Sequence, residues 1–289
     1  MQIETSDLAS SHRQPRWSPT GKVSMEQLGR WFTFVAIPLV ALAAWEIAAS
    51  VLSKSLGPFF PRLSAVGLAL FDWATGMTGT TVIYSGQLWA AALDSGRRIL
   101  IGFCIACLLG IPLGVLVGWF GLARRAADPF LQMIRPIPVT AWVPISMLWF
   151  GIGDKAAVYL IVLATFFPIY LNTTQGVRYL DRVTIRAGQM LGARGWRLLL
   201  YVVVPAALPS IFSGLRVSVG FGWMAVVVSE LVAVKNGLGY VMFDAYGFLR
   251  ADIVVASMIV IGFLGFMCDR LMLLLERRAL GWAHIQQEG

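Results

Sequence analysis

Residues able to do metal, redox or acid–base chemistry are few and widely separated in this sequence. The two histidines, His12 and His284, lie near the two ends of the chain. Cys104 and Cys107 form a C-x-x-C pair inside an apolar run, without a second pair, whereas a closed structural zinc site needs four ligands. We therefore interpret the cysteines as packing residues. The sequence predicts no metal site, no cofactor bound by this chain and no catalytic constellation.

The composition indicates an integral membrane protein. Of its 289 residues, 58% are hydrophobic and only 13% are charged, and the mean hydropathy is +0.74. Soluble domains have about 45–50% apolar and about 25% charged residues. The net charge of +8 is divided among tails and loops between apolar runs. A positive-inside bias explains this distribution more simply than nucleic-acid binding, so we predict no nucleic-acid partner.

Apolar runs that approach the length of a membrane span, about 20 residues, occur six times. They cover 31–52, 99–120, 131–150, 155–172, 208–234 and 253–275. The sequence therefore predicts an all-α membrane protein with about six transmembrane helices. Because Lys and Arg gather in alternate loops, we place both termini in the cytoplasm. We expect a cytoplasmic tail over 1–30, a transmembrane domain over 31–280 and a second cytoplasmic tail over 281–289.

Four charged residues stand at costly positions for a membrane protein. Glu46 and Glu230 lie inside predicted spans, where a charge normally faces protein. Glu46 either does so or lies near the outer interface, and Glu230 needs a partner that the sequence does not identify. Arg97 and Arg98 precede the second span at its outer end, against the charge rule. They are either interfacial residues that snorkel or arginines that help to guide an anion.

Small residues recur at steps of four in two predicted spans, and such a stripe lets another helix come close. The second span carries Gly102, Ala106, Gly110, Gly114 and Gly118. The fifth carries Ala206, Ser210, Gly214, Ser218 and Gly222, and Glu230 continues that series by two further steps. For the stripe of the fifth span two interpretations are open, a seam between two copies of the chain or the wall of a pathway.

The start of the third predicted span cannot be a regular helix, because Arg135-Pro136-Ile137-Pro138 is followed by Pro144. Unwound backbone at membrane depth is tolerated only where protein or a water-filled cavity meets it. The segment is thus a candidate wall of a translocation pathway, with ordinary kinked packing as the alternative. The candidate pathway residues are Pro138, Ala141, Trp142, Ser218, Gly222 and Glu230.

The most polar of the long runs between two apolar segments extends from Val177 to Leu215, and it turns apolar again from Pro205. It holds one acid, Asp181, against Arg178, Arg182, Arg186, Arg194 and Arg197. A loop with this excess of positive charge should lie in the cytoplasm. Polar and apolar residues alternate at helical spacing in its centre. That pattern predicts a short helix outside the bilayer, offered to a soluble partner.

This loop resembles the signature loop of bacterial ABC-importer permeases, an E-A-A-like opening with a glycine four residues on and a V/I-x-L-P close. The matching residues are Arg186-Ala187-Gly188, Gly192 and Val202-Val203-Val204-Pro205. Arg186 replaces the glutamate of the general pattern, as it does in the taurine and sulfonate branch. The runs Arg135 to Pro144 and Trp149 to Gly153 (W-F-G-I-G) are also similar to that branch.

The resemblance implies the permease subunit of a type I ABC importer of the nitrate/sulfonate/taurine family, in the bacterial inner membrane. Such permeases pair as homodimers, bind two ATPase subunits that carry ATP and Mg²⁺, and receive substrate from a periplasmic or extracellular binding protein. The loop would be the coupling helix that docks on the ATPase, with Gly188 and Gly192 allowing close approach. Trp196 would anchor one end, either against the ATPase or against lipid. The implied docking residues are Arg186, Ala187, Gly188, Leu191, Gly192, Ala193, Arg194, Trp196 and Pro205.

Other classes of membrane protein fit the sequence less well. The chain has no G-x-x-x-x-G-K-[ST] motif, so we expect ATP hydrolysis from a separate subunit and no enzymatic activity here. A secondary carrier predicts inverted repeats, which we do not find. A membrane enzyme would need a cluster of His, Asp or Glu within the spans, and a channel would need a filter motif. For the substrate, taurine or another sulfonate leads, and nitrate, bicarbonate or a small heterocycle remains open.

Overall fold

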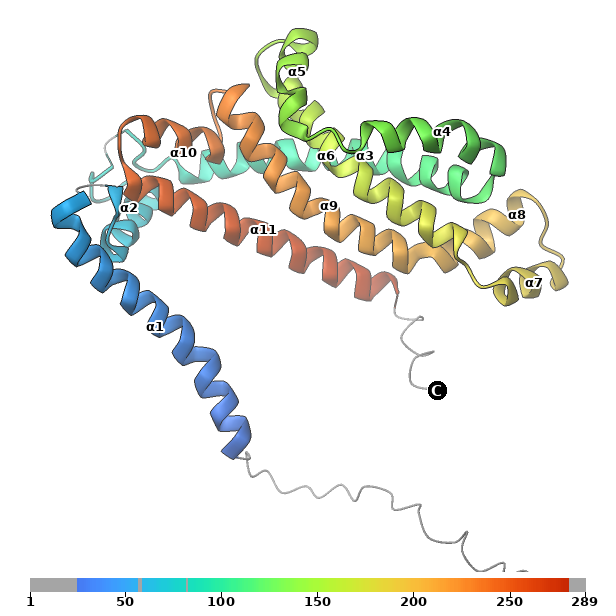
Figure 1. Ribbon diagram of the computed structural model, residues 1–289, viewed down its shortest axis with the longest axis horizontal. Coiled ribbons are helices and arrows are strands. Elements are labelled where there is room, and N and C mark those ends of the chain that lie inside the picture. Colours follow the sequence, from blue (N-terminus) through green and yellow to red (C-terminus); the bar gives the residue numbers. More distant parts are fainter. Residues whose placement is uncertain (1–24, 57–58, 82, 281–289) are drawn as a thin grey trace, which may run out of the picture. The chain divides into compact units, whose positions relative to one another are not determined.

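The computed structural model describes residues 25–56, 59–81 and 83–280 (Figure 1). The predicted tail 281–289 and most of the predicted tail 1–30, with both histidines, lie outside the described residues. Every regular element in the described ranges is helical, which confirms the predicted fold class. The chain divides into two compact units, Met1–Ala48 and Ala49–Gly289, and each is described by itself.

The elements follow one another with short connections. In chain order they are α1 (Met25–Leu56), α2 (Leu63–Thr75), α3 (Leu88–Trp119), α4 (Gly121–Ile134), the 3₁₀ turn η2 (Val139–Trp142), α5 (Val143–Phe150), α6 (Asp154–Arg178), α7 (Arg182–Met190), α8 (Trp196–Leu198), the π-helical turn η3 (Leu199–Val203), α9 (Val204–Val232), α10 (Leu238–Gly247) and α11 (Ala251–Ala279). In the first unit, the described part is the beginning of α1.

Four described helices are long and apolar enough to cross a membrane. They are Leu88–Trp119, Asp154–Arg178, Trp196–Val232 and Ala251–Ala279, and they correspond to the second, fourth, fifth and sixth predicted spans. The second begins earlier than predicted, because the helix continues through the charged residues Asp94, Arg97 and Arg98. The first predicted span corresponds to a shorter apolar segment, Ala36–Leu52 of α1.

The third predicted span is not one helix of spanning length. α4 ends at Ile134, and a regular α-helix resumes only at Val143 for the eight residues of α5. Pro136 and Pro138 lack the N–H that a helix needs, and each also disfavours helical backbone at the residue before it. The predicted irregular start is therefore confirmed, whereas a continuous span over 131–150 is corrected to two helices and a 3₁₀ turn.

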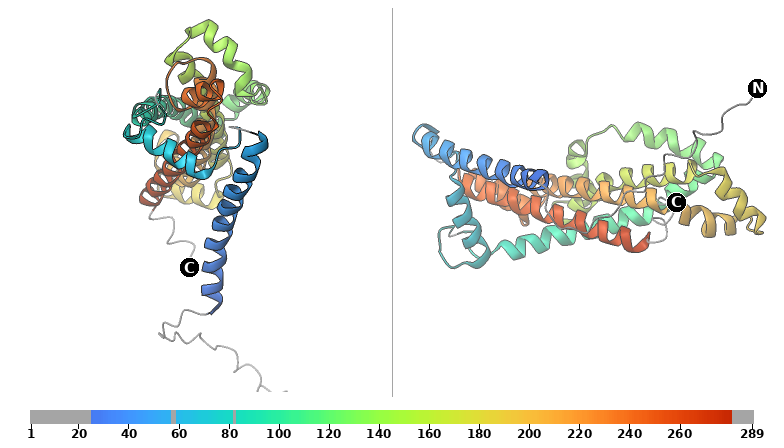
Figure 2. Two further views of the ribbon diagram at one scale, coloured as in Figure 1. Left: turned by 90° about the vertical axis from the view of Figure 1, so that its left-hand side faces the viewer. Right: turned by 90° about the horizontal axis from the view of Figure 1, so that it is seen from below.

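α6 is the central helix of the second unit, with its most extensive contacts against α3 and α9 (Figures 1 and 2). The glycine stripe of α3 faces it. A Cβ atom added at Gly114 would lie 2.7 Å from the Cβ of Thr173, and one added at Gly118 would lie 2.8 Å from the Cβ of Val177. The two backbones therefore approach so closely that these positions exclude a side chain, as the stripe predicts.

The small-residue stripe of α9 packs against the other side of α6. A Cβ atom added at Gly214 would lie 2.7 Å from the Cβ of Asn172, and one added at Gly222 would lie 3.2 Å from Cγ2 of Thr165. Ser218, between them, is buried. The interpretation of this stripe as a seam between two copies is therefore wrong, because α6 of the same chain already covers it.

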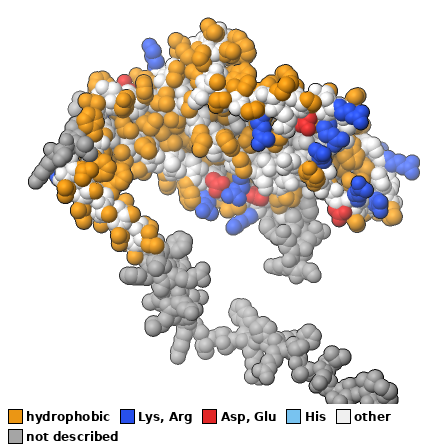
Figure 3. Space-filling model, viewed as in Figure 1, with side chains coloured by type: hydrophobic (Ala, Val, Ile, Leu, Met, Phe, Trp, Pro, Cys, Tyr) orange, Lys and Arg blue, Asp and Glu red, His pale blue; other side chains and the backbone are white. Residues whose placement is uncertain are grey.

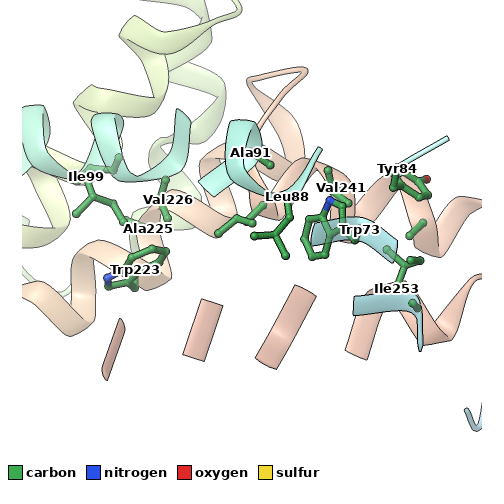
Figure 4. Packing of buried hydrophobic residues seen from close by; sticks show 14 of the residues in the cluster. Trp73, Tyr84, Leu88, Ala91, Ile99, Trp223, Ala225, Val226, Val241 and Ile253 are labelled. Carbon is green, nitrogen blue, oxygen red and sulfur yellow. The ribbon is translucent and has the colours of Figure 1, made fainter. Parts of the chain in front are cut away.

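Apolar clusters lie toward both ends of the bundle, which we call the α10 end and the α7 end after the helices that they carry. The larger cluster, at the α10 end, combines side chains of α2, α3, α9, α10 and α11 (Figure 4), among them Trp73, Leu88, Trp223, Val241 and Ile253. At the α7 end, Val115, Val177 and Val203 join α3, α6 and η3. Both ends of the long helices are thus held by packing.

The loop after α2 folds around a single carboxylate. Asp72 is buried and accepts hydrogen bonds from the backbone N–H groups of Thr78 (2.9 Å), Gly79 (2.7 Å) and Thr81 (2.8 Å). The Thr81 hydroxyl also donates to it. This hydroxyl, together with the backbone donors, holds the pKa of Asp72 well below its usual range. The loop therefore depends on a charged Asp72.

Candidate functional site

α7 is a short helix that the structure presents to the outside at the α7 end. It begins at the N-cap residue Asp181, whose carboxylate accepts a hydrogen bond of 2.9 Å from the N–H of Val183. Apolar side chains near its two ends are nevertheless exposed: Val183 by 69%, Met190 by 88% and Leu191 by 90%. The predicted short helix in this loop is thus confirmed, and it displays apolar groups that the described part of the chain does not cover.

Gly188 attaches α7 to the rest of the bundle. It is the buried residue of the helix, and a Cβ atom added there would lie 2.9 Å from Cγ2 of Val202 and 3.1 Å from Cδ1 of Leu198. Its close approach is therefore to η3 and α8 of its own chain. This corrects the expectation that Gly188 faces a partner. The contact fixes α7 against the bundle, because the side chains of Val202 and Leu198 pack directly on the Gly188 backbone.

The turn after α7 requires glycine for a different reason. Gly192 has φ +86° and Gly195 has φ +55°, both in the left-handed region that favours glycine. Nothing lies within 4 Å of a Cβ atom added at Gly192, so space is not the constraint. The N–H of Gly192 donates to the Gln189 carbonyl, and that of Ala193 donates to the Gly188 carbonyl, each at 3.0 Å. Gly192 therefore allows the chain to reverse direction after α7.

The remaining predicted docking residues surround this turn. The Trp196 ring lies 5.6 Å from the Phe120 ring and is 61% exposed, so one side of it packs on the end of α3. Pro205 stands in the first turn of α9, where its missing N–H is tolerated. Arg186, Ala187 and Arg194 are exposed, and Ala193 is half-buried. Lys and Arg side chains gather over the part of the bundle that carries α4, α7 and α8 (Figure 3).

A hollow of about 370 Å³ lies beside the broken segment between α4 and α5. Its walls come from Arg135 to Val139, from α6 between Leu163 and Asn172, and from Val217 and Phe221 of α9. These parts of α6 and α9 are near the middle of each helix. The unwound backbone thus borders a cavity halfway along the spans, which is the setting that such backbone requires.

The predicted pathway residues divide between this hollow and the protein interior. Pro138 lines the hollow, and Ala141 and Trp142 follow it in η2. Ser218, Gly222 and Glu230 are instead buried among the helices. On α9 the hollow is lined by the direct neighbours of two of them, Val217 and Phe221, which sequence reasoning missed. Neighbours on a helix point about 100° apart, so the small stripe faces α6 while its neighbours face the hollow.

Glu230 has the partners that its depth requires. Its carboxylate accepts hydrogen bonds from Nη1 of Arg98 at 2.7 Å, from Oγ of Ser95 at 2.7 and 2.9 Å, and from the N–H of Gly239 at 2.8 Å. Both charged side chains are almost completely buried, Arg98 with 1% exposure and Glu230 with none. The expectation of a partner for Glu230 is therefore confirmed. A buried pair of this kind is tolerated when its remaining hydrogen-bonding groups are satisfied.

Arg98 extends this cluster to two further elements. Its Nε donates to Oδ1 of Asp154 at 2.7 Å, and its guanidinium also bonds the carbonyl and side chain of Asn236. Both interpretations of Arg98 from the sequence are wrong, because an arginine that is buried and paired with carboxylates of its own chain neither snorkels nor meets a passing anion. Arg97, by contrast, is 61% exposed and pairs with Asp154 at 2.6 Å. The cluster joins α3, α6, α9 and the turn before α10.

Long apolar helices, an exposed basic helix at one end and an unwound segment beside a hollow at mid-length define a multi-span helical membrane protein. Residues 110–281 match the family model described as "binding-protein-dependent transport system inner membrane component". The chain belongs to this family and is the permease subunit of an ABC importer.

Several named permeases resemble the chain over most of its length. The taurine transport system permease protein of Escherichia coli is 38% identical over 206 residues, 71% of this chain and 75% of the relative. The putative aliphatic sulfonates transport permease protein of E. coli is 36% identical over 88% of this chain and 94% of the relative. The nitrate import permease protein of Leptolyngbya laminosa is 30% identical over 92% and 95%.

A solved structure shows the same fold. The inward-facing MetNI methionine ABC transporter matches with a TM-score of 0.52 and 18% identity, over 64% of this chain and 97% of that one.

Proposed function

We propose that this permease imports a small sulfonate such as taurine, delivered by a periplasmic or extracellular binding protein, and that α7 is its coupling helix. The observation that carries the coupling role is that one face of α7 packs on the bundle while the apolar side chains near its C-terminal end are exposed. Gly188 holds it against η3, while Met190 and Leu191 are about nine-tenths exposed. Sulfonate as the substrate is supported by the likeness to the taurine and aliphatic sulfonate permeases.

The contacts of α7 give a route by which a force applied to it reaches the spans. α7 touches η3 through Gly188, and η3 continues without a break into α9. Val203 of η3 packs in one cluster with Val177 of α6 and Val115 of α3. Movement of α7 is therefore transmitted to three spans together. In our proposal two copies of the permease dock on two ATPase subunits, which hold ATP and Mg²⁺ and supply that movement.

The proposed orientation follows from charge. The α7 end carries the basic loop and faces the cytoplasm, where the ATPase subunits are, and the α10 end faces the binding protein. Both chain termini then lie in the cytoplasm, and the membrane is the bacterial inner membrane. Accessibility of an engineered cysteine at exposed Tyr179 to a membrane-impermeant thiol reagent, in spheroplasts and in inverted vesicles, checks this orientation.

A matched pair of glycine substitutions tests the coupling role. Gly192→Val places a β-branched residue at φ +86°, which strains the turn after α7 by about 1–3 kcal/mol. Gly121→Val, at the start of α4, also has open space but no positive φ. We expect Gly192→Val to abolish uptake and binding-protein-stimulated ATPase activity without loss of membrane insertion, and Gly121→Val to retain both. Normal uptake by the Gly192→Val complex would refute the docking assignment.

Nitrate is the second candidate substrate, because the nitrate import permease covers almost the whole chain. The two candidates differ in competition: excess taurine should suppress uptake of a labelled alkanesulfonate, and excess nitrate should not. Suppression by nitrate alone would reverse the assignment.

A further inference from the structure

We propose that the hollow beside the broken segment is a binding site for a small organic sulfonate, with Arg135 as the residue that binds the negatively charged sulfonate group. This inference rests on the proposed function, because it takes a sulfonate as the cargo. It goes further in assigning this chain a substrate site of its own, formed by the segment Arg135 to Val139, α6 and α9.

The charge in the lining of the hollow is positive only. Among the described residues, Arg135 is the one charged side chain in the lining, and none of them places a carboxylate at the cavity. The guanidinium forms no ion pair with any residue in 25–56, 59–81 or 83–280. Arg98 and Arg216, which also belong to the helical bundle, each pair with a carboxylate of this chain. Within the described part of the chain, Arg135 is thus an uncompensated positive charge facing a cavity.

The depth of the hollow along the helices indicates what the positive charge of Arg135 requires. The lining of α6 extends from Leu163 to Asn172 within Asp154–Arg178, and Val217 and Phe221 lie at the middle of α9. A charged side chain at the centre of a span is expensive unless it faces water or an opposite charge. Arg135 therefore needs an anion or a hydrated cavity at that depth, and a cavity that conducts an anion provides both.

The other walls suit the body of a small sulfonate. They are apolar and aromatic, with Phe167, Leu171 and Phe221 among them. Asn172 is the one other polar side chain that the described residues bring to the lining. Its amide N–H donates to the Pro168 carbonyl at 2.8 Å, which leaves its oxygen as an acceptor that suits an ammonium group such as that of taurine. A volume of about 370 Å³ lies within the range of about 300–1,000 Å³ for small-molecule sites.

Thiol labelling tests the charge of the hollow directly. Val217→Cys is placed in a chain whose own cysteines, Cys104, Cys107 and Cys268, are replaced by serine, and is assembled with the ATPase and binding protein in liposomes. Its reaction rates are measured with a methanethiosulfonate that carries a sulfonate and with one that carries a trimethylammonium. Two opposite charges about 6 Å apart in a half-hydrated cavity change a rate by about tenfold. Loss of the positive charge slows the anionic reagent and speeds the cationic one, each by about tenfold. We therefore expect Arg135→Gln to lower the ratio of anionic to cationic rates by about a hundredfold.

Three comparisons make this result specific. Arg135→Lys should restore most of the ratio, because it keeps the charge. At Tyr179→Cys, a residue that is 73% exposed and does not line the hollow, Arg135→Gln should leave the ratio unchanged. Taurine should slow the anionic labelling of Val217→Cys in the complex with Arg135 and should not do so in the complex with Arg135→Gln.

Uptake provides the second readout. Arg135→Gln should lower taurine uptake by about tenfold, the factor expected for a single rate, while ATPase stimulation by the loaded binding protein persists. Arg125→Gln, on the preceding helix α4 and outside the lining, should leave uptake near the unmodified level. An unchanged labelling ratio and unchanged uptake in Arg135→Gln would overturn the inference and leave the proposed function standing.

Two further outcomes distinguish an anion site from a contact between permease copies and from a failure of the proposed function. If Arg135→Gln, but not Arg135→Lys, dissociates the two permease copies in a cross-linking assay, Arg135 pairs with a second copy and the inference is wrong. If the unmodified complex takes up no sulfonate, the proposed function fails. The labelling ratio then still decides whether the hollow attracts anions.

Discussion

Arg97 and Arg98 give a sharp test of what holds the α10 end together, because they are neighbours that share one partner. Both guanidinium groups bond Asp154, at 2.6 and 2.7 Å. They differ in burial, since the Arg97 side chain is 61% exposed and the Arg98 side chain 1%. Arg98 also pairs with Glu230, which is completely buried. We predict that Arg98→Met is strongly destabilising and that Arg97→Met is nearly neutral.

The magnitudes follow from what each substitution leaves behind. Arg98→Met leaves the Glu230 carboxylate buried without a cation, and breaking a buried pair in this way costs about 3–5 kcal/mol. Arg97→Met removes an exposed ion pair, which contributes about 0–1 kcal/mol. The double variant Arg98→Met/Glu230→Gln removes both buried charges. It should cost less than the sum of its single substitutions, because the two side chains interact directly.

The assay is reversible unfolding of the purified chain in mixed detergent micelles, followed by tryptophan fluorescence across a denaturing-detergent titration. The free energy of unfolding of Arg98→Met should fall below that of Arg97→Met by at least about 2 kcal/mol, the difference between the two ranges above. Equal losses in the two variants would refute the claim that burial of the Arg98–Glu230 pair, rather than contact with Asp154, secures this end.

Two further perturbations test the packing and the loop. Gly114→Ala on α3 should lower the free energy of unfolding by about 1–3 kcal/mol, because its methyl group overlaps α6. Gly96→Ala on the same helix has open space and should raise the free energy of unfolding by about 0.5–1 kcal/mol. The same denaturing-detergent titration measures both variants, and changes of the same sign in the two would contradict the close contact between α3 and α6. Because the pKa of Asp72 is depressed in the folded chain, its contribution is present at neutral pH and is lost only as the pH falls through that lowered value, below the ordinary Asp value of about 4. Asp72→Asn should therefore speed amide hydrogen exchange at Gly79 and Thr81 at neutral pH, and unchanged exchange there would show that the carboxylate does not hold the loop.

Features with a local periodicity were predictable from the sequence. Glycines at steps of four on α3 indicated a close helix contact, and the structure supplies α6 as the neighbour. The alternation of residues after Asp181 indicated α7, and the prolines at 136 and 138 indicated the irregular segment. In each case the signal lies within one turn or a few turns of helix, so no knowledge of the distant chain was needed.

Features that depend on a distant partner were not predictable. Arg98 and Glu230 are separated by 132 positions, and nothing local shows that they meet. The stripe of α9 correctly marked a close contact, but α6 was one of several surfaces able to cover it. The contact of Gly188 with Val202 was not predictable either, because it depends on how the chain returns through η3. On α9 the sequence indicated Ser218 as a pathway residue, whereas its neighbour Val217 lines the hollow. Which of the two faces the hollow depends on how α9 is rotated about its axis, and that rotation is known only once α6 is in place.

The most direct test of the function is ATPase activity of the reconstituted complex in liposomes, which contains this chain, its partner ATPase and its binding protein. Taurine, a longer alkanesulfonate and nitrate are compared as ligands of the binding protein. We predict stimulation by the sulfonate-loaded binding protein, together with ATP-dependent uptake of that sulfonate. Uptake that an ion gradient alone drives, with no ATPase bound to the chain, would contradict the coupling role of α7. Stimulation of the ATPase activity by the nitrate-loaded binding protein alone would contradict the assignment of a sulfonate as the substrate.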